Sequence, residues 1–173
     1  MNYLGIDKAS INNGPGVRVV LWVSGCTVNC KGCQNPESWD FNAGKLFDDD
    51  AKQELFDALD KPYIQGVTIS GGHPLEKKNK LRVFNLIKEI KENFPDKDIW
   101  LYTGYKLSND DFKQPKFDIV MPNEDLWKCD VIVDGPYIEE QRDITLKFRG
   151  SKNQRLINVK ETLKQGEIIT IQD

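Results

Sequence analysis

The chain has 173 residues, of which 39% are hydrophobic and 29% are charged, a composition typical of a folded domain with one substantial core. A net charge of −3 gives no basic footprint for nucleic acid or for an anionic membrane surface, and no apolar run approaches the length of a transmembrane helix. We therefore expect a single domain over residues 1–173, with neither a nucleic-acid partner nor a membrane partner.

Predicted strands and helices alternate along most of the chain, which is typical of an α/β fold. The nearly continuous apolar run 18–23 predicts a strand buried on both faces, as in a parallel sheet. Alternating apolar and polar residues over 144–148 predict a half-exposed strand instead. In chain order, the predicted strands cover residues 3–6, 18–23, 66–70, 99–103, 117–120, 130–133, 144–148 and 168–171.

Two helices and one short helical turn are expected between these strands. Residues 48–50, all aspartates, supply an N-cap and favourable first-turn charge for a helix that Pro62 ends. A longer helix is expected over roughly 77–93, where apolar residues recur at helical spacing, and Pro95 stops it. Its apolar stripe comprises Leu81, Phe84, Ile87 and Ile90. Residues 109–112 predict a short helix or turn.

The carboxyl ends of parallel strands meet at one edge of a sheet, which is where α/β proteins place their sites. Cys26, Gly71, Tyr102 and Asp134 each follow a predicted strand, so we expect them to converge there. The strands are too few for a closed eight-stranded barrel. The predicted fold class is therefore α/β, a partial (open) β/α barrel with a mostly parallel sheet.

Three of the four cysteines, Cys26, Cys30 and Cys33, lie within eight residues at C-x3-C-x2-C spacing. Three thiolates on one loop, in a chain that lacks a secretion signal, favour a metal over disulfides and predict a cytoplasmic location. Zinc sites usually pair C-x2-C units, whereas this spacing suits three corners of a [4Fe–4S] cluster whose fourth iron has no protein ligand. A zinc site completed by His73 or Cys129 is the alternative on ligand chemistry.

This loop resembles the signature of the radical S-adenosylmethionine superfamily. The resemblance implies that the three cysteines hold a [4Fe–4S] cluster, that S-adenosylmethionine chelates the open iron, and that the fold is that superfamily's partial barrel. It implies no catalytic residue beyond the cluster. The residue before the third cysteine, often aromatic in the superfamily, is Gly32 here. Contact with the adenine would therefore come from the backbone around Gly32, Cys33 and Gln34.

A second segment, Ser70 to Pro74, is similar to the superfamily's Gly-Gly-Glu motif. By this resemblance, backbone oxygens around Gly71 and Gly72 would hold the amino group of the cofactor's methionine. Glycine also lets a backbone approach a ligand closely. His73 stands where the acidic residue is expected, and the resemblance implies that it binds the cofactor together with Gly71 and Gly72 through the backbone.

Further segments resemble the activating proteins of anaerobic ribonucleoside-triphosphate reductases. That resemblance implies a radical that abstracts hydrogen from a glycine of the reductase large subunit, a flavodoxin-like or other low-potential electron donor, and a cofactor contact at Asp134. Another glycyl-radical activase, a deazapurine-forming enzyme and a non-catalytic zinc module remain alternatives. The segments are 13–18, 35–39, 102–105, 130–136 and 149–155.

Overall fold

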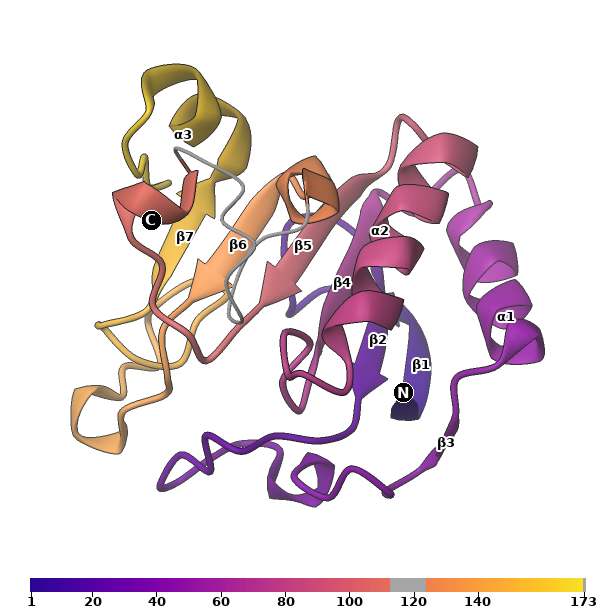
Figure 1. The fold of residues 1–173 in the computed structure, drawn as a ribbon, viewed down its shortest axis with the longest axis horizontal. Helices are drawn as coiled ribbons and strands as arrows, with labels where there is room; N and C mark the ends of the chain where they lie inside the picture. The colour runs from indigo at the N-terminus through magenta and orange to yellow at the C-terminus, as the bar shows by residue number, and fades with distance from the viewer. Residues whose placement is uncertain (113–123, 173) are drawn as a thin grey trace.

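The computed structural model describes residues 1–112 and 124–172 (Figure 1). A seven-stranded sheet lies at its centre, in the order β3-β1-β2-β4-β5-β6-β7. The strands are β1 (Asn2–Ser10), β2 (Arg18–Val23), β3 (Lys45–Leu46), β4 (Gly66–Gly71), β5 (Asp98–Tyr102), β6 (Val131–Asp134) and β7 (Arg155–Asn158). The α-helices are α1 (Asp49–Leu59), α2 (Lys80–Asn93) and α3 (Val159–Gln165), and 3₁₀ turns cover Pro36–Ser38, Asn109–Phe112, Glu124–Lys128 and Glu139–Gln141.

The centre of the sheet is parallel and its edges are antiparallel. Strands β2, β4, β5 and β6 run in the same direction, whereas β1 and β3 at one edge and β7 at the other pair antiparallel. The register places Val23 beside Gly71 and Tyr102 beside Val133. This confirms the predicted α/β class and brings the carboxyl ends of four strands to one edge of the sheet.

Helices α1 and α2 cover one face of this sheet (Figure 1). The carboxylate of Asp48 accepts a hydrogen bond from the Ala51 N–H at 3.0 Å, which confirms the predicted N-cap of α1. Leu81 is 67% exposed, so its place in the predicted apolar stripe was wrong. The helix begins at Lys80, and the first buried residue of its sheet-facing side is Val83. In the described part of the chain, no helix has the length and apolar character needed to cross a membrane.

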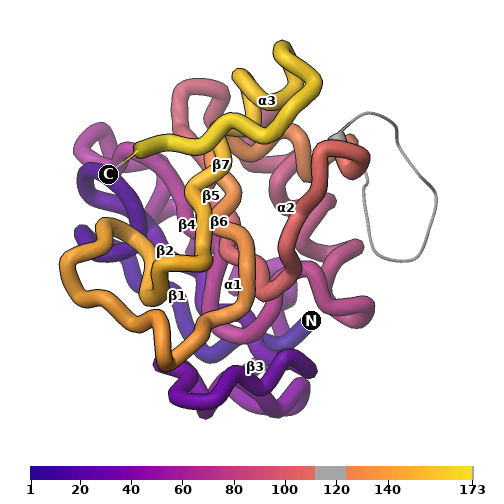
Figure 2. Tube along the Cα trace, turned by 90° about the vertical axis from the view of Figure 1, so that its left-hand side faces the viewer, coloured from indigo at the N-terminus to yellow at the C-terminus, as the bar shows by residue number. Residues whose placement is uncertain are grey.

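The opposite face of the sheet is covered by loop residues. On β5, Ile99 and Leu101 point into the core beneath the helices, while Trp100 and Tyr102 point the other way, as strand alternation requires. The loop that follows β6 covers this second face, where Phe148 packs edge-on against Trp100 at 5.4 Å between ring centroids. In Figure 2 that loop, drawn in orange, and α2 lie on opposite sides of the strands.

The sequence-based prediction was wrong in the last third of the chain. Residues 144–148 form turns rather than a strand, and Phe148 has a left-handed φ of 58°, which no strand adopts. Residues 168–171 contribute only an isolated bridge between Thr170 and Ile157, while β7 and α3 were not predicted. Phe148 of this run packs onto the sheet from a loop, whereas Ile144 is 86% exposed, so the apolar alternation does not reflect one buried strand face. The strand predicted at 117–120 lies outside the described residues.

Candidate metal centre and its pocket

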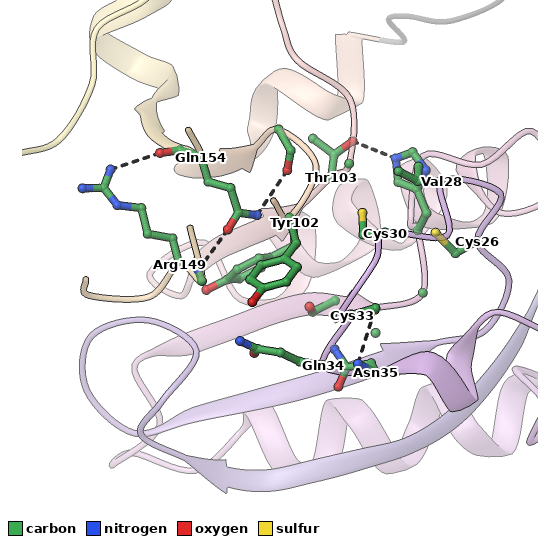
Figure 3. A pocket seen from close by; sticks show the side chains of 18 of the residues that line it. Cys26, Val28, Cys30, Cys33, Gln34, Asn35, Tyr102, Thr103, Arg149 and Gln154 are labelled. Carbon is green, nitrogen blue, oxygen red and sulfur yellow. Dashed lines mark hydrogen bonds between the residues drawn. The ribbon is translucent and has the colours of Figure 1, made fainter. Parts of the chain in front are cut away.

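A cavity of about 340 Å³ opens on the loop-covered face at the carboxyl edge of the parallel strands. It brings together the cysteine loop after β2, the glycines after β4 and the segment after β5. The predicted site residues among its walls are Cys26, Cys30, Cys33, Gln34, Gly71, Gly72 and His73. Figure 3 shows the three cysteines around this pocket with Tyr102, Thr103 and Arg149.

Left-handed backbone turns shape the cysteine loop. Asn29 (φ 48°) lies between the first two cysteines and Gly32 (φ 71°) between the last two, so the chain reverses within each gap. The Cys33 N–H donates to the Cys30 carbonyl at 3.1 Å, which closes the second turn. The Cys33 sulfur in turn accepts the Asn35 N–H at 3.4 Å.

The thiols of this loop are close enough to influence one another. All three are free and partly buried. Burial raises the pKa of Cys30, a hydrogen bond from the backbone of Tyr137 opposes that rise, and charge repulsion from Cys33 and Cys26 adds to it. Three clustered thiolates repel one another unless a cation-rich centre neutralises them, and they are the ligands that iron–sulfur clusters use. The donor set therefore fits such a cluster.

The unusual glycine of the loop has a structural explanation. Gly32 adopts a conformation that side chains disfavour, and a Cβ built there would lie 2.8 Å from the Glu139 carboxylate. Glu139 also pairs with Lys31 at 3.2 Å. Gly32 is not among the residues that line the cavity, so a side chain at this position would meet Glu139 rather than a bound cofactor.

Gly32→Ala is expected to destabilise the metal-free protein by about 1–2 kcal/mol, the cost of placing a side chain at left-handed φ. Chemical denaturation would measure the change. Gly5→Ala is the matched control, because Gly5 has no positive φ and a Cβ at this position would meet nothing within 4 Å, so little change is expected. Equal effects of the two substitutions would contradict the structural explanation for Gly32.

The glycine pair packs directly against the start of the cysteine loop. Gly71 has a φ of 101°, and a Cβ there would lie 2.6 Å from the Val23 carbonyl oxygen. The Gly72 N–H donates to that same carbonyl at 2.7 Å, and the His73 N–H donates to the Gly25 carbonyl at 2.8 Å. Only glycine permits this close approach at position 71, which keeps the backbone of both loops at the cavity wall.

His73 is buried and held from two sides. Its Nε2 lies 2.8 Å from the Thr103 hydroxyl, its Nδ1 lies 3.4 Å from a Glu76 oxygen, and its ring packs edge-on against Tyr105. The side chain is 1% exposed, and this burial lowers the pKa of His73 although Glu76 opposes the shift. A ligand atom each from Cys26, His73 and Glu76 lies within 4.8 Å of the others. His73, one of the two residues considered as a fourth zinc ligand, therefore lies near the first cysteine of the loop.

Cys129, the other residue considered for zinc, immediately precedes β6 and so lies at the amino edge of the parallel strands, away from the cysteine loop. It belongs to the core beneath the helices, is 3% exposed, and has a raised pKa because of burial. In the metal-free protein we expect iodoacetamide to label Cys26, Cys30 and Cys33 readily and Cys129 only after unfolding. Peptide mapping by mass spectrometry checks this, and rapid labelling of native Cys129 would contradict it.

Glu76 was not singled out from the sequence. It is 6% exposed, and its Oε1 accepts the N–H of Thr27 at 2.8 Å and the Thr27 hydroxyl at 2.5 Å. Burial alone would raise the pKa of Glu76, but these hydrogen bonds and the nearby His73 outweigh it and lower the pKa. A carboxylate three residues after the Gly-Gly-His segment, in the turn that leads into α2, is the signal that could have identified it.

Asp134 lies apart from the cavity. It is fully buried, its two oxygens accept from Arg155 Nε at 2.9 Å and Arg155 Nη2 at 2.5 Å, and it also accepts the Leu107 N–H at 2.8 Å. The next residue, Gly135, does line the cavity. The structure thus gives the Asp134 carboxylate protein partners rather than placing it in the cavity wall.

The segment 149–155 is tied back onto the chain by its amide side chains. Gln154 accepts the N–H groups of Gly150 and Ser151 at 2.9 and 3.2 Å and donates to the Gly135 carbonyl at 3.1 Å. The Tyr102 hydroxyl donates to the Phe148 carbonyl at 2.5 Å, and burial raises the pKa of that tyrosine. These contacts hold the loop over the cavity, where Phe148 and Arg149 form part of the wall.

Comparison with known proteins agrees with this donor set. Residues 12–157 match the family described as a 4Fe-4S single cluster domain. The chain is 44% identical over 156 residues to an anaerobic ribonucleoside-triphosphate reductase-activating protein from Haemophilus influenzae, covering 89% of this chain and 96% of that protein. A protein of the same name from Enterobacteria phage T4 is 45% identical over 156 residues, covering 90% and 93% of the two chains.

The corresponding Escherichia coli K12 protein is 38% identical over 156 residues, which cover 89% of this chain and 96% of that protein. Each alignment spans nearly the whole of both proteins, so the likeness is not confined to one motif. The chain belongs to the 4Fe–4S single cluster domain family and, within it, to the anaerobic ribonucleoside-triphosphate reductase-activating proteins.

Proposed function

We propose that this protein activates an anaerobic ribonucleoside-triphosphate reductase by generating a glycyl radical on its large subunit. Cys26, Cys30 and Cys33 would hold the [4Fe–4S] cluster, and S-adenosylmethionine would bind at the iron that has no protein ligand. The observation that carries the proposal is the convergence of three free thiols and a glycine pair in one cavity. Relatives of this chain carry the reductase in their names.

Cys26, Cys30 and Cys33 would hold a cluster whose chemistry, when it is bound and reduced, would be one-electron cleavage of S-adenosylmethionine to methionine and a 5′-deoxyadenosyl radical, with hydrogen-atom transfer from the glycine of the reductase. The residues of this chain would bind the cluster and S-adenosylmethionine, orient them toward the glycine, and shield the radical from water. The cavity volume of about 340 Å³ lies within the range of small-molecule sites. Val28, Leu146 and Phe148 contribute apolar side chains to the cavity walls.

One buried donor supports a polar ligand in the cavity. The indole Nε1 of Trp39 is buried and makes no hydrogen bond to any residue within 1–112 or 124–172, and Trp39 lines the cavity. Buried polar atoms normally find partners, so polar groups of a bound cofactor are suitable ones. The backbone of Gly71 and Gly72 would hold the amino group, with the backbone of Cys33 and Gln34 beside the adenine.

The proposal also covers the barrel architecture, the cellular compartment and the electron donor. The parallel strands β2, β4, β5 and β6 would form a partial, open β/α barrel whose inner face carries the cavity, with the whole chain acting as one activating domain. Free thiols at the site suit the reducing conditions of the cytoplasm. A flavodoxin-like or other low-potential protein would deliver the electron.

Anaerobic reconstitution tests this function. The protein should take up iron and acid-labile sulfide, show an EPR signal on reduction, and, with S-adenosylmethionine and the reductase large subunit, produce a glycyl-radical EPR signal. A protein that binds only zinc would contradict the proposal. Loss of that zinc in His73→Ala would then point to the mononuclear site near Cys26. A cluster that cleaves S-adenosylmethionine but leaves the reductase without a radical would indicate a different substrate.

A further inference from the structure

We propose that Glu76 is a positioning residue that locks the first cysteine of the loop to the Gly-Gly-His segment. This inference rests on the proposed function, because it concerns how the cluster loop and the cofactor cradle keep a common geometry. Glu76 does not line the cavity, and its carboxylate is engaged by both donors of Thr27, so we assign its role to that contact although one of its oxygens lies within 4.8 Å of the Cys26 sulfur.

The carboxylate captures both donors of the residue next to Cys26. A single oxygen of Glu76, Oε1, accepts the Thr27 N–H at 2.8 Å and the Thr27 hydroxyl at 2.5 Å. Thr27 and Glu76 are 49 positions apart in sequence, so the contact joins two separate loops. Because Glu76 is 6% exposed, water cannot readily replace a lost partner.

Two other contacts from the same turn complete the attachment. The Asn79 side-chain amide, which is 1% exposed, donates to the Ser24 carbonyl at 2.9 Å and to the His73 carbonyl at 3.2 Å. The His73 N–H donates to the Gly25 carbonyl at 2.8 Å. The chain is therefore held on both sides of Cys26, at residues 24, 25 and 27, by the segment that begins with the glycine pair.

The second and third cysteines are held differently. The Cys33 N–H donates to the Cys30 carbonyl and the Cys33 sulfur accepts from Asn35 within the loop, while Cys30 is contacted by the backbone of Tyr137 and not by the turn before α2. The Cys26 N–H donates to the Trp39 carbonyl at 3.1 Å, and the first cysteine is in addition linked through Thr27 to the turn before α2. Removal of the Glu76 side chain should therefore displace Cys26 relative to the glycine pair while leaving the local turn at Cys30 and Cys33 intact.

Two substitutions of Glu76 distinguish the effect of its hydrogen-bond acceptor from the effect of its negative charge. Both Thr27 donors reach one oxygen, so glutamine at position 76 can accept them with its amide oxygen, whereas alanine accepts neither. Glu76→Gln should therefore preserve the attachment and Glu76→Ala should abolish it. Glu92→Ala provides the matched control, because Glu92 is an exposed glutamate on α2 whose contact is an ion pair with Lys88 at 3.9 Å.

The first measurement uses metal-free protein and does not depend on the reaction. Iodoacetamide labelling followed by peptide mapping gives a rate for each thiol. In Glu76→Ala we expect labelling of Cys26 to accelerate relative to Cys30 and Cys33 by more than in Glu76→Gln, which removes only the negative charge within 4.8 Å of the Cys26 sulfur, whereas Glu92→Ala should keep the wild-type ratio. An unchanged ratio in Glu76→Ala, or an equal change in Glu76→Gln, overturns the proposal.

The second measurement uses the reconstituted protein. Iron and sulfide content should remain near wild type, while affinity for S-adenosylmethionine and the change it causes in the EPR spectrum of the reduced cluster should fall about tenfold in Glu76→Ala, a loss typical of removing a partner of a metal-bound residue. Glu76→Gln should restore both. If wild type shows no response to S-adenosylmethionine, the proposed function fails, and the labelling ratio still decides the role of Glu76.

A second variant covers the case in which Glu76→Ala does not fold. Thr27→Val keeps the backbone N–H and the branched shape but removes the hydroxyl donor, so it should reproduce the accelerated labelling of Cys26 to a smaller extent. Wild-type labelling in folded Thr27→Val, together with an unfolded Glu76→Ala, would overturn the proposal in favour of a general structural role for the carboxylate.

Discussion

Cys30→Ala is expected to abolish cluster assembly and, with it, glycyl-radical formation on the reductase. Cys30 lies in the middle of the loop, is partly buried, and shares its electrostatic environment with Cys26 and Cys33. Two remaining thiolates cannot hold a cluster that uses three, so iron should fall from about four atoms per chain to below about one. Iron and sulfide analysis after anaerobic reconstitution measures this, and EPR with the reductase measures the radical.

Cys129→Ala is the matched control for this loss. Cys129 is 3% exposed in the core beneath the helices, so the substitution removes one buried sulfur at a cost of about 1 kcal/mol and should leave iron content unchanged. Full iron content in Cys30→Ala, or loss of iron in folded Cys129→Ala, would show that the cluster is held by a different ligand set.

Asp134→Ala is expected to destabilise the metal-free protein by about 3 kcal/mol. The substitution leaves the guanidinium of Arg155 and the Leu107 N–H without their buried acceptor. Breaking a buried pair from one side costs about 3–5 kcal/mol, and the lower end applies because the Arg155 side chain retains 28% exposure. Denaturant titration gives the free energy, and the melting temperature should fall by roughly 6–12 °C.

The same variant distinguishes a structural role from the cofactor contact that the resemblance implied for Asp134. Where Asp134→Ala remains folded, affinity for S-adenosylmethionine should stay near wild type, because the carboxylate lies outside the cavity wall. Glu92→Ala, which breaks an exposed ion pair, should change stability by less than about 1 kcal/mol. A large loss of cofactor affinity with unchanged stability would instead favour a direct cofactor contact at Asp134.

Local sequence patterns were sufficient to predict the strands and helices in the central part of the fold. The apolar run of β2 and the helical spacing of Phe84, Ile87 and Ile90 depend on short-range periodicity, and the structure confirms both elements. The N-cap at Asp48 is likewise a local signal. In the tail, by contrast, Leu146 and Phe148 mimic strand alternation although they belong to a loop that lies on the sheet.

The sequence by itself determined the chemistry of the site, because C-x3-C-x2-C spacing and a glycine pair after a strand are contiguous motifs. Parallel strand order then made their convergence predictable. Tertiary structure alone decided the partners of the buried charged groups. Asp134 pairs with Arg155, 21 positions away, and Glu76 holds Thr27, 49 positions away. Buried charges need partners wherever the fold supplies them, so no local pattern reveals whether a carboxylate faces a cofactor or supports the loop beside it.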